Sequence, residues 1–279
     1  MIEIIKFYRI GDWIKNLGIV LIAWMLLPTY EANFLILSVF SVALLFSSAY
    51  SLNDYLDFTI SGEDNQMSYL INKKKVNKML IGLLCLFPSG FLFLLIYKNF
   101  DKMLLSLIFL FLFFIYSSTP FVFKKNLILR FLINIICIVV IPFLFVNMFI
   151  SLVNLFFIII FASHIFSTEI IHQVAHMDED EKSGLNTLPM RIGIQSSLKM
   201  FIFTQLLLIL FFSVILLNNF KDNSIFIITI VFSFFRILKI LRIKKVVNVN
   251  FSKLRESLYG WQEGLFYLFY LLFLKFHLF

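Results

Sequence analysis

Residues 34–57 read FLILSVFSVALLFSSAYSLNDYLD, and this stretch decides the class of fold. Its first 19 residues carry no charge, as expected for a helix that crosses a bilayer. Asn53, Asp54 and Asp57 follow directly, and such side chains next to a membrane helix are costly unless they line a polar cavity or pair with another group. Asn53 and Asp57 are four residues apart, so they share one helical face. The stretch predicts a membrane-spanning helix that ends in a polar site.

The whole chain has the composition of a membrane protein. Its 279 residues are 61% hydrophobic and 14% charged, with 38 Phe and a mean hydropathy of +0.96. A soluble domain has about 45–50% apolar and about 25% charged residues. A large water-soluble core, intrinsic disorder and a disulfide scaffold are therefore excluded. The N-terminus lacks the features of a signal peptide, and both cysteines lie in apolar runs, where a thiol behaves as a small hydrophobe.

Apolar runs of helical length recur along the chain, and none shows the alternation of a membrane β-barrel. We expect nine transmembrane helices, near residues 15–30, 33–57, 77–97, 102–118, 126–148, 151–173, 199–218, 224–240 and 258–277. No linker or change in composition separates them. Residues 1–279 are therefore predicted to form a single all-α integral membrane domain.

Lysine and arginine positions predict how these helices are oriented. With the N-terminus in the cytoplasm, 20 of the 24 basic residues fall on the cytoplasmic side, whereas Lys98, Lys102 and Lys221 lie in outer loops. Cytoplasmic loops of membrane proteins are enriched in Lys and Arg. We therefore expect a protein of the plasma (cytoplasmic) membrane with its N-terminus in the cytoplasm. The net charge of +8 reflects topology, and nucleic acid is not an expected partner.

A second acidic segment, HQVAHMDEDEKSGLNTLP (172–189), follows the sixth predicted helix, and it places His176 and Asp180 four residues apart. Residues 54–64 and 178–181 together hold half of the 16 carboxylates, and both segments lie on the predicted cytoplasmic side near Lys-rich loops. Carboxylate and amide oxygens suit Mg²⁺ held together with substrate phosphates. A Mg²⁺–diphosphate site facing the cytoplasm is one interpretation, and solvated loop charge is the other. A transporter should instead carry acids deep within its helices or show inverted repeats.

At these residues the sequence resembles the UbiA superfamily of intramembrane polyprenyltransferases. The family motif N-D-x-x-D-x-x-x-D matches NDYLDFTIS (53–61), and D-x-x-x-D-x-x-x-G-x-x-T matches HMDEDEKSGLNT (176–187). The resemblance covers essentially the whole chain and implies nine helices around a lateral, lipid-facing chamber. Ser61 and His176 depart from the pattern, because each stands where family members carry Asp. Nearby acids could supply the missing oxygens, or the site could hold fewer metal ions.

The resemblance also implies roles for individual residues. It makes Asn53, Asp57 and Asp180 the expected catalytic residues and the ligands of Mg²⁺. Further substrate-binding residues are expected in DWIKN (12–16), NKKK (72–75) and YSSTPFVFKK (116–125) and within the two motifs, and they are Lys15, Lys73, Lys74, Tyr116, Lys124, Asp54 and His176.

The reaction expected from the resemblance is transfer of a polyprenyl group. A prenyl diphosphate would enter from the membrane lipid, its diphosphate would be held by Mg²⁺ and lysines, and C1 would become cationic before a small aromatic or lipid acceptor attacks. Two alternatives stay open. One is phosphoribosyl transfer to a polyprenyl phosphate, which DWIKN weakly indicates, and the other is a non-catalytic lipid-binding or transport protein with the same fold.

A polar stripe on the sixth predicted helix completes the set of candidates. Glu169, His172 and Gln173 lie at helical spacing within an apolar segment. Exposure of these side chains to lipid is unfavourable. Hydrogen bonding to neighbouring elements and lining of a pocket both explain them.

Overall fold

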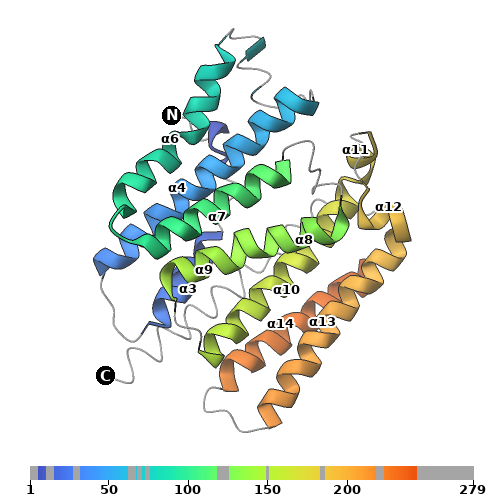
Figure 1. The fold of residues 1–279 in the computed structure, drawn as a ribbon. Coiled ribbons are helices and arrows are strands. Elements are labelled where there is room, and N and C mark those ends of the chain that lie inside the picture. Colours follow the sequence, from blue (N-terminus) through green and yellow to red (C-terminus); the bar gives the residue numbers. More distant parts are fainter. Residues whose placement is uncertain are drawn as a thin grey trace. The chain divides into compact units, whose positions relative to one another are not determined.

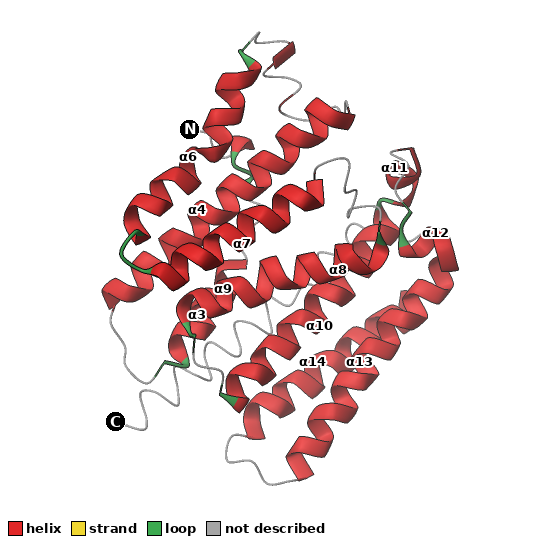
Figure 2. Cartoon of the chain, viewed as in Figure 1, coloured by secondary structure: helices red, strands yellow, loops and turns green. Residues whose placement is uncertain are grey.

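Helices form all the regular structure in the part of the chain that the computed structural model describes. That part comprises residues 6–10, 16–27, 32–61, 67, 71–72, 76–117, 126–148, 151–182, 186–217 and 223–243. The helices drawn in Figure 2 confirm the all-α prediction over these residues. The chain divides into two compact units, Met1–Phe149 and Ile150–Phe279, and each is described by itself. The single domain expected from the sequence stays a prediction.

The first unit is organised around one long helix, α4, which packs against four others, α3, α6, α7 and α9. In Figure 1, α6 and α7 run alongside it, and α3 contacts both α4 and α9. The elements of this unit are α3 (Leu17–Met25), α4 (Ala32–Leu56), the π-helical turn η2 (Asp57–Ser61), α6 (Lys78–Ile96), α7 (Phe100–Ser117), α8 (Leu127–Ile135), the π-helical segment η5 (Ile136–Val140) and α9 (Ile141–Val146).

The contact between α4 and α6 is close because small and polar residues lie on it. Pro88 lies within α6, and the backbone N–H of the next residue, Ser89, donates to Ser48 Oγ on α4 at 2.8 Å. Two turns away, a side chain at Gly82 would place its Cβ 3.3 Å from the ring of Tyr55. Small residues let membrane helices approach closely, and hydrogen bonds between helices add to the packing. This face of α4 is therefore held firmly just before its polar end.

The second unit contains the other acidic segment and two long helices that pack side by side. Helices α13 and α14 make the most extensive contact, and α10 packs on α13 (Figure 1). A buried hydrogen bond joins Gln205 Nε2 on α13 to Ser167 Oγ on α10 at 2.8 Å. The elements of this unit are α10 (Leu152–Ala175), α11 (Met177–Lys182), α12 (Leu188–Ile192), α13 (Ile194–Leu217) and α14 (Asn223–Ile243).

Six of the described helical segments are long and apolar enough to cross a membrane. They are Asn33–Thr59, Lys78–Ile96, Phe100–Ser117, Leu127–Val146, Leu152–Ala175 and Ile194–Leu216. Two further predicted spans correspond to α3, which has nine residues, and to α14, which carries Arg236, Lys239 and Arg242. The predicted ninth helix, 258–277, lies outside the described residues. The chain is an integral membrane protein, and the count of nine helices stays a prediction.

One predicted helix differs in its interior. The span expected over 126–148 changes from α-helical to π-helical hydrogen bonding at Ile136–Val140 and then continues as α9. Pro142, near the start of α9, has no backbone N–H and cannot take part in a regular helical ladder. Changes of helical register commonly occur at such positions. Apolar patterning does not indicate this feature, because it leaves the hydrophobicity of the span unchanged.

Candidate functional site

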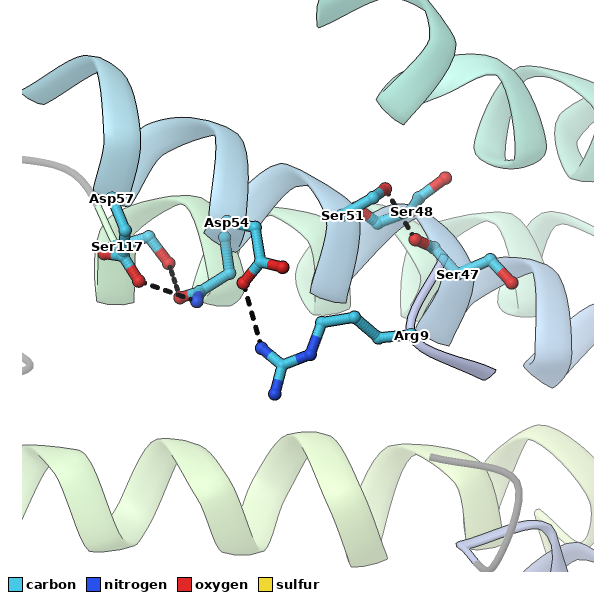
Figure 3. Close-up of polar contacts among 8 residues, drawn as sticks. Arg9, Ser47, Ser48, Ser51, Asp54, Asp57 and Ser117 are labelled. Atoms are coloured by element: carbon cyan, nitrogen blue, oxygen red, sulfur yellow. Dashed lines mark hydrogen bonds and ion pairs between the residues drawn. The ribbon is translucent and has the colours of Figure 1, made fainter. Parts of the chain in front are cut away.

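Three polar side chains meet where α4 ends. Asn53 Nδ2 donates to Asp57 Oδ2 at 2.9 Å, and Ser117 Oγ on α7 donates to Asn53 Oδ1 at 2.6 Å. Figure 3 shows this chain of contacts linking the end of α4 to the end of α7. The Asp57 carboxylate is only 7% exposed and Ser117 is 9% exposed. Hydrogen bonds therefore orient the Asn53 amide from both sides, and its oxygen retains a further lone pair.

The helix widens where this cluster forms. Residues Asp57–Ser61 form the π-helical turn η2, which continues directly from α4. Within it, the Thr59 hydroxyl donates to the backbone carbonyl of Tyr55 at 2.8 Å. Isolated π-helical turns are rare and are frequent at functional sites. Asp57 is the first residue of this turn, so its bond with Asn53 joins the last α-helical turn to the start of the π-helical one.

Asp54 forms a different contact from its neighbours. Arg9 Nη1 lies 2.9 Å from Asp54 Oδ1, in an ion pair whose side chains are 35% and 15% exposed. The guanidinium carbon also lies 5.4 Å from the ring centroid of Tyr50, one turn earlier on α4. A partly exposed ion pair contributes about 0.2–1 kcal/mol, and a cation–π contact about 0.5–1 kcal/mol. Figure 3 shows Arg9 reaching toward Asp54 while Asp57 and Ser117 form the separate cluster.

The segment that carries Arg9, residues 6–10, is packed against other parts of the first unit. Phe7 is buried in an apolar cluster with Met67, Ile71, Ile81 and Cys85. Tyr8 donates its hydroxyl to the backbone carbonyl of Leu84 at 3.1 Å, and burial raises the pKa of this phenol. Arg9 itself has φ = +50°, a left-handed conformation that costs a non-glycine residue about 1–2 kcal/mol. The side-chain contacts of Arg9 offset this strain.

A row of aromatic rings on α4 and α7 extends from the polar cluster along the contact between these two helices. Tyr50 packs against Phe113 of α7 at 6.1 Å between ring centroids, and Phe113 packs against Tyr116 at 6.4 Å. Further along the same contact, the Phe46 and Phe109 rings lie 5.6 Å apart. Tyr116, expected as a substrate-binding residue, is thus adjacent in sequence to Ser117 at the polar cluster. Its role in binding stays a prediction.

The second acidic segment begins at a break between two helices, α10 and α11. Helix α10 ends at Ala175, His176 is its capping residue with φ = −112°, and α11 begins at Met177. Across this break, the Asp180 backbone N–H donates to the His176 carbonyl at 2.9 Å. The His172 and His176 rings lie 4.6 Å apart with an angle of 69° between their planes. His176 and Asp180 are thus held at one turn's separation, as their spacing indicates.

Gln173 ties the end of α10 to the chain that follows the second motif. Its side chain is fully buried, it accepts the backbone N–H of Leu188 at 2.9 Å, and its amide nitrogen lies 3.3 Å from Glu169 Oε1. Leu188 is the first residue of α12, and the residue before it, Thr187, is 1% exposed. Of the two explanations for the polar stripe, hydrogen bonding to a neighbouring element holds for Gln173, which reaches α12, whereas its bond with Glu169 lies within α10.

Several predicted site residues fall outside the described part of the chain. They are Lys15, Lys73, Lys74 and Lys124. Ser61 ends η2, and its side chain is not described. Among the described residues, no three His, Cys, Asp or Glu side chains group as metal ligands do. The oxygens brought together within the first unit are therefore those of Asn53, Asp57 and Ser117.

Two residues in this arrangement were missed by the sequence analysis. Ser117 is one serine in an apolar helix, and nothing in its spacing connects it with Asn53, 64 positions earlier. Arg9 was assigned to membrane topology, which accounts for a basic residue before a span without any partner. One feature of the sequence could have indicated a partner for Asp54. Asn53 and Asp57 share one face of the helix, so the Asp54 carboxylate lies on a different face and needs a cation or solvent there.

Comparisons with known proteins agree with this fold. Residues 16–253 match the model of the UbiA prenyltransferase family. A UbiA homolog from Archaeoglobus fulgidus bound to DMAPP and Mg²⁺ has a TM-score of 0.72 at 14% identity, with 97% of this chain and 98% of that chain covered. A digeranylgeranylglyceryl phosphate synthase has a TM-score of 0.67 at 19% identity, with 95% of this chain and 96% of that chain covered.

A further structure of the A. fulgidus homolog, bound to GPP and Mg²⁺, has a TM-score of 0.70 at 14% identity and covers 95% of this chain and 99% of that chain. At these identities the structures show a shared fold. A comparison with curated proteins finds no match.

Proposed function

The chain belongs to the UbiA prenyltransferase family, and from that premise we propose that it moves a polyprenyl group from a prenyl diphosphate to an aromatic or lipid acceptor, with Mg²⁺, at the cytoplasmic face of the plasma membrane. One observation carries the proposal: the Asn53 amide and the buried Asp57 carboxylate are hydrogen-bonded to each other at the end of a membrane-spanning helix. A carboxylate withdrawn from water at this position is costly unless it serves binding or pairs with another group.

The donor atoms in the cluster fit Mg²⁺. This hard cation prefers oxygen ligands and is held by one or two carboxylates together with substrate phosphates. Asp57 contributes a carboxylate and Asn53 an amide oxygen, and Asn53 Oδ1 keeps a lone pair beside its bond from Ser117. Asp180 is the proposed ligand from the second unit. Bound there, Mg²⁺ would neutralise charge that develops on the departing diphosphate.

The neighbouring aromatic side chains suit the other half of the substrate. In the proposed reaction the bond between C1 and the diphosphate oxygen breaks, the diphosphate keeps the bonding electrons, and the acceptor attacks C1 and loses a proton. Tyr50, Phe113 and Tyr116 lie next to the polar cluster and present rings of the kind that stabilise a cation. The proposed partners are thus a prenyl diphosphate donor, a small aromatic or lipid acceptor and the surrounding membrane lipid.

Turnover by the purified full-length protein tests this function. The protein in lipid nanodiscs is incubated with labelled geranyl or geranylgeranyl diphosphate, Mg²⁺, and either a phenolic acid or a phosphoglycerol lipid. We expect release of diphosphate, a labelled prenylated product with one acceptor class, and loss of both on chelation of Mg²⁺. Asp101→Asn, an exposed change at the far end of α7, serves as a control that should keep full activity.

Two other results would redirect the assignment. A ribose-linked product formed from phosphoribosyl diphosphate and a polyprenyl phosphate, without prenyl transfer, would establish the phosphoribosyl alternative. Tight binding of prenyl lipids with no product in any mixture would indicate a non-catalytic lipid-binding protein.

The cytoplasmic location of the site has its own test. Single cysteines at Ser68 and Ser183, placed near the two motifs, should both react with an impermeant thiol reagent from the cytoplasmic side only. Labelling from opposite sides would contradict both the predicted topology and a site shared by the two motifs.

A further inference from the structure

Asp54 lies between the two residues of the polar cluster in sequence, yet its carboxylate is occupied elsewhere. Asn53 and Asp57 bond to each other, whereas Asp54 Oδ1 is 2.9 Å from Arg9 Nη1. On a helix, residue 54 is offset by about 100° from residue 53 and by about 60° from residue 57. Asp54 can therefore be reached from a neighbouring face of α4 while Asn53 and Asp57 face the site.

The arginine is delivered to Asp54 by a packed segment. Phe7 is anchored in the apolar cluster, Tyr8 bonds to the Leu84 carbonyl of α6, and the left-handed turn at Arg9 is closed by its backbone N–H to the Lys6 carbonyl at 3.1 Å. The guanidinium then covers Tyr50 and Asp54, which are one helical turn apart. The strained backbone at Arg9 is thus held in place by the packing of the two residues before it.

The contact between Arg9 and Asp54 lies at the end of α4, next to the polar cluster. Residues 53–56 are the last turn of α4, and Asp57 is the first residue of the π-helical turn η2, where the hydrogen-bonding register of the helix changes. Two contacts from neighbouring helices already restrain this turn, since Ser117 of α7 bonds to Asn53 and the Tyr55 ring lies close to Gly82 of α6. Asp54 is within the same turn, so the bond from Arg9 adds a further restraint, from the N-terminal segment, on the rotation at which Asn53 and Asp57 present their oxygens.

From these contacts we propose that Arg9 and Asp54 are a pair of positioning residues: the pair holds the last turn of α4 in the orientation that the Asn53–Asp57 cluster requires, and Asp54 is not a ligand of the metal. The inference rests on the proposed function of that cluster. It assigns a purpose to the N-terminal segment 6–10 and separates Asp54 from the other two polar residues of the first motif.

A double-mutant cycle tests the pair. Arg9→Gln, Asp54→Asn and the double variant are compared for kcat, KM of the prenyl diphosphate and the Mg²⁺ concentration for half-maximal rate. We expect each single variant to lose about tenfold in kcat/KM, mostly in kcat, and the double variant to lose no more than the worse single one, because residues that act through one contact are not additive. Arg9→Lys, which keeps the charge, should recover most of the loss.

Controls and contrary results are specific. Arg242→Gln and Asp101→Asn remove one charge of each sign at exposed positions and should leave all three parameters unchanged. If Asp54→Asn alone raises the half-saturating Mg²⁺ concentration tenfold while Arg9→Gln leaves it unchanged, Asp54 is a ligand and the inference is wrong. Losses that multiply in the double variant overturn it as well.

The pair can also be examined without turnover. Unfolding midpoints of the same four proteins in detergent should show the same non-additivity, because the contact exists without substrate. If the wild-type protein transfers no prenyl group, the proposed function fails, whereas coupling in the midpoints still supports the contact. Additive midpoints overturn the pair whatever the activity.

Discussion

The two acidic motifs lie at helix ends of different construction. In the first unit α4 continues without interruption into η2, and side-chain hydrogen bonds align Asn53 with Asp57. In the second unit the chain breaks at His176, and a backbone bond from Asp180 to His176 holds the acidic segment. The first motif is thus held by side chains of its own residues and of α7, whereas the second combines a backbone bond with the Gln173 side chain, which holds the chain that follows it. Substitutions should therefore affect the two motifs differently.

The largest effect should come from the carboxylates themselves. Asp57→Ala and Asp180→Ala are each expected to lower kcat by about 10²-fold or more, because lost contacts to a departing diphosphate are lost from the transition state. Diphosphate release measures this loss, and detergent unfolding checks that the variants are folded. If one substitution abolishes turnover and the other does not, the two motifs do not share a site. Near-normal activity in both would show that the acids are solvated helix ends.

The next effect concerns the glutamine that supports the second motif. Gln173→Ala leaves the buried Leu188 N–H without its acceptor, which costs about 1–3 kcal/mol. We expect a lower unfolding midpoint together with about tenfold lower kcat, since the segment before α12 loses its attachment. Gln195→Ala, an exposed change at the start of α13, is the matched control. An unchanged midpoint would mean that the backbone break alone orders this motif.

A smaller effect is expected for the serine that supports the first motif. Ser117→Ala removes the bond to Asn53 Oδ1, and one such bond contributes about 0.5–1.5 kcal/mol. Activity should fall about threefold to tenfold with the Mg²⁺ requirement raised, because the amide is held from one side only. Ser106→Ala on the same helix is the control, since that hydroxyl bonds the Lys102 carbonyl of its own helix. Equal effects of the two variants would contradict a role for the cross-helix bond.

The smallest expected effect is a lower Mg²⁺ requirement, from a substitution at His176. His176 stands where the family carries Asp, and Mg²⁺ prefers oxygen to imidazole nitrogen. His176→Asp should lower the Mg²⁺ concentration for half-maximal rate by about threefold, as one more carboxylate faces the cation. The measurement is a Mg²⁺ titration of the initial rate. Loss of activity with an unchanged Mg²⁺ requirement would assign His176 to the acceptor instead.

Much of the fold follows from composition and periodicity. The spans over 33–57, 77–97 and 102–118 agree with α4, α6 and α7 to within a few residues, because a long uncharged segment has few alternatives to a helix in lipid. The span over 126–148 contains a π-helical segment that hydrophobicity does not register. The predicted helix over 199–218 begins earlier, at Ile194, directly after Gly193 with φ = +79°.

For this protein, the sequence by itself determined the membrane class, the helical fold, the family and the one-turn pairing of Asn53 with Asp57. Each depends on residues close together in the chain or on a motif, and helical geometry converts such spacing directly into proximity. Only the tertiary structure decided that Ser117 orients Asn53, that Arg9 occupies Asp54 and that Gln173 holds the start of α12. The Ser117 and Arg9 contacts join residues 64 and 45 positions apart, and the Gln173 contact spans 15. Packing of helices and loops creates such contacts, and no local pattern encodes them.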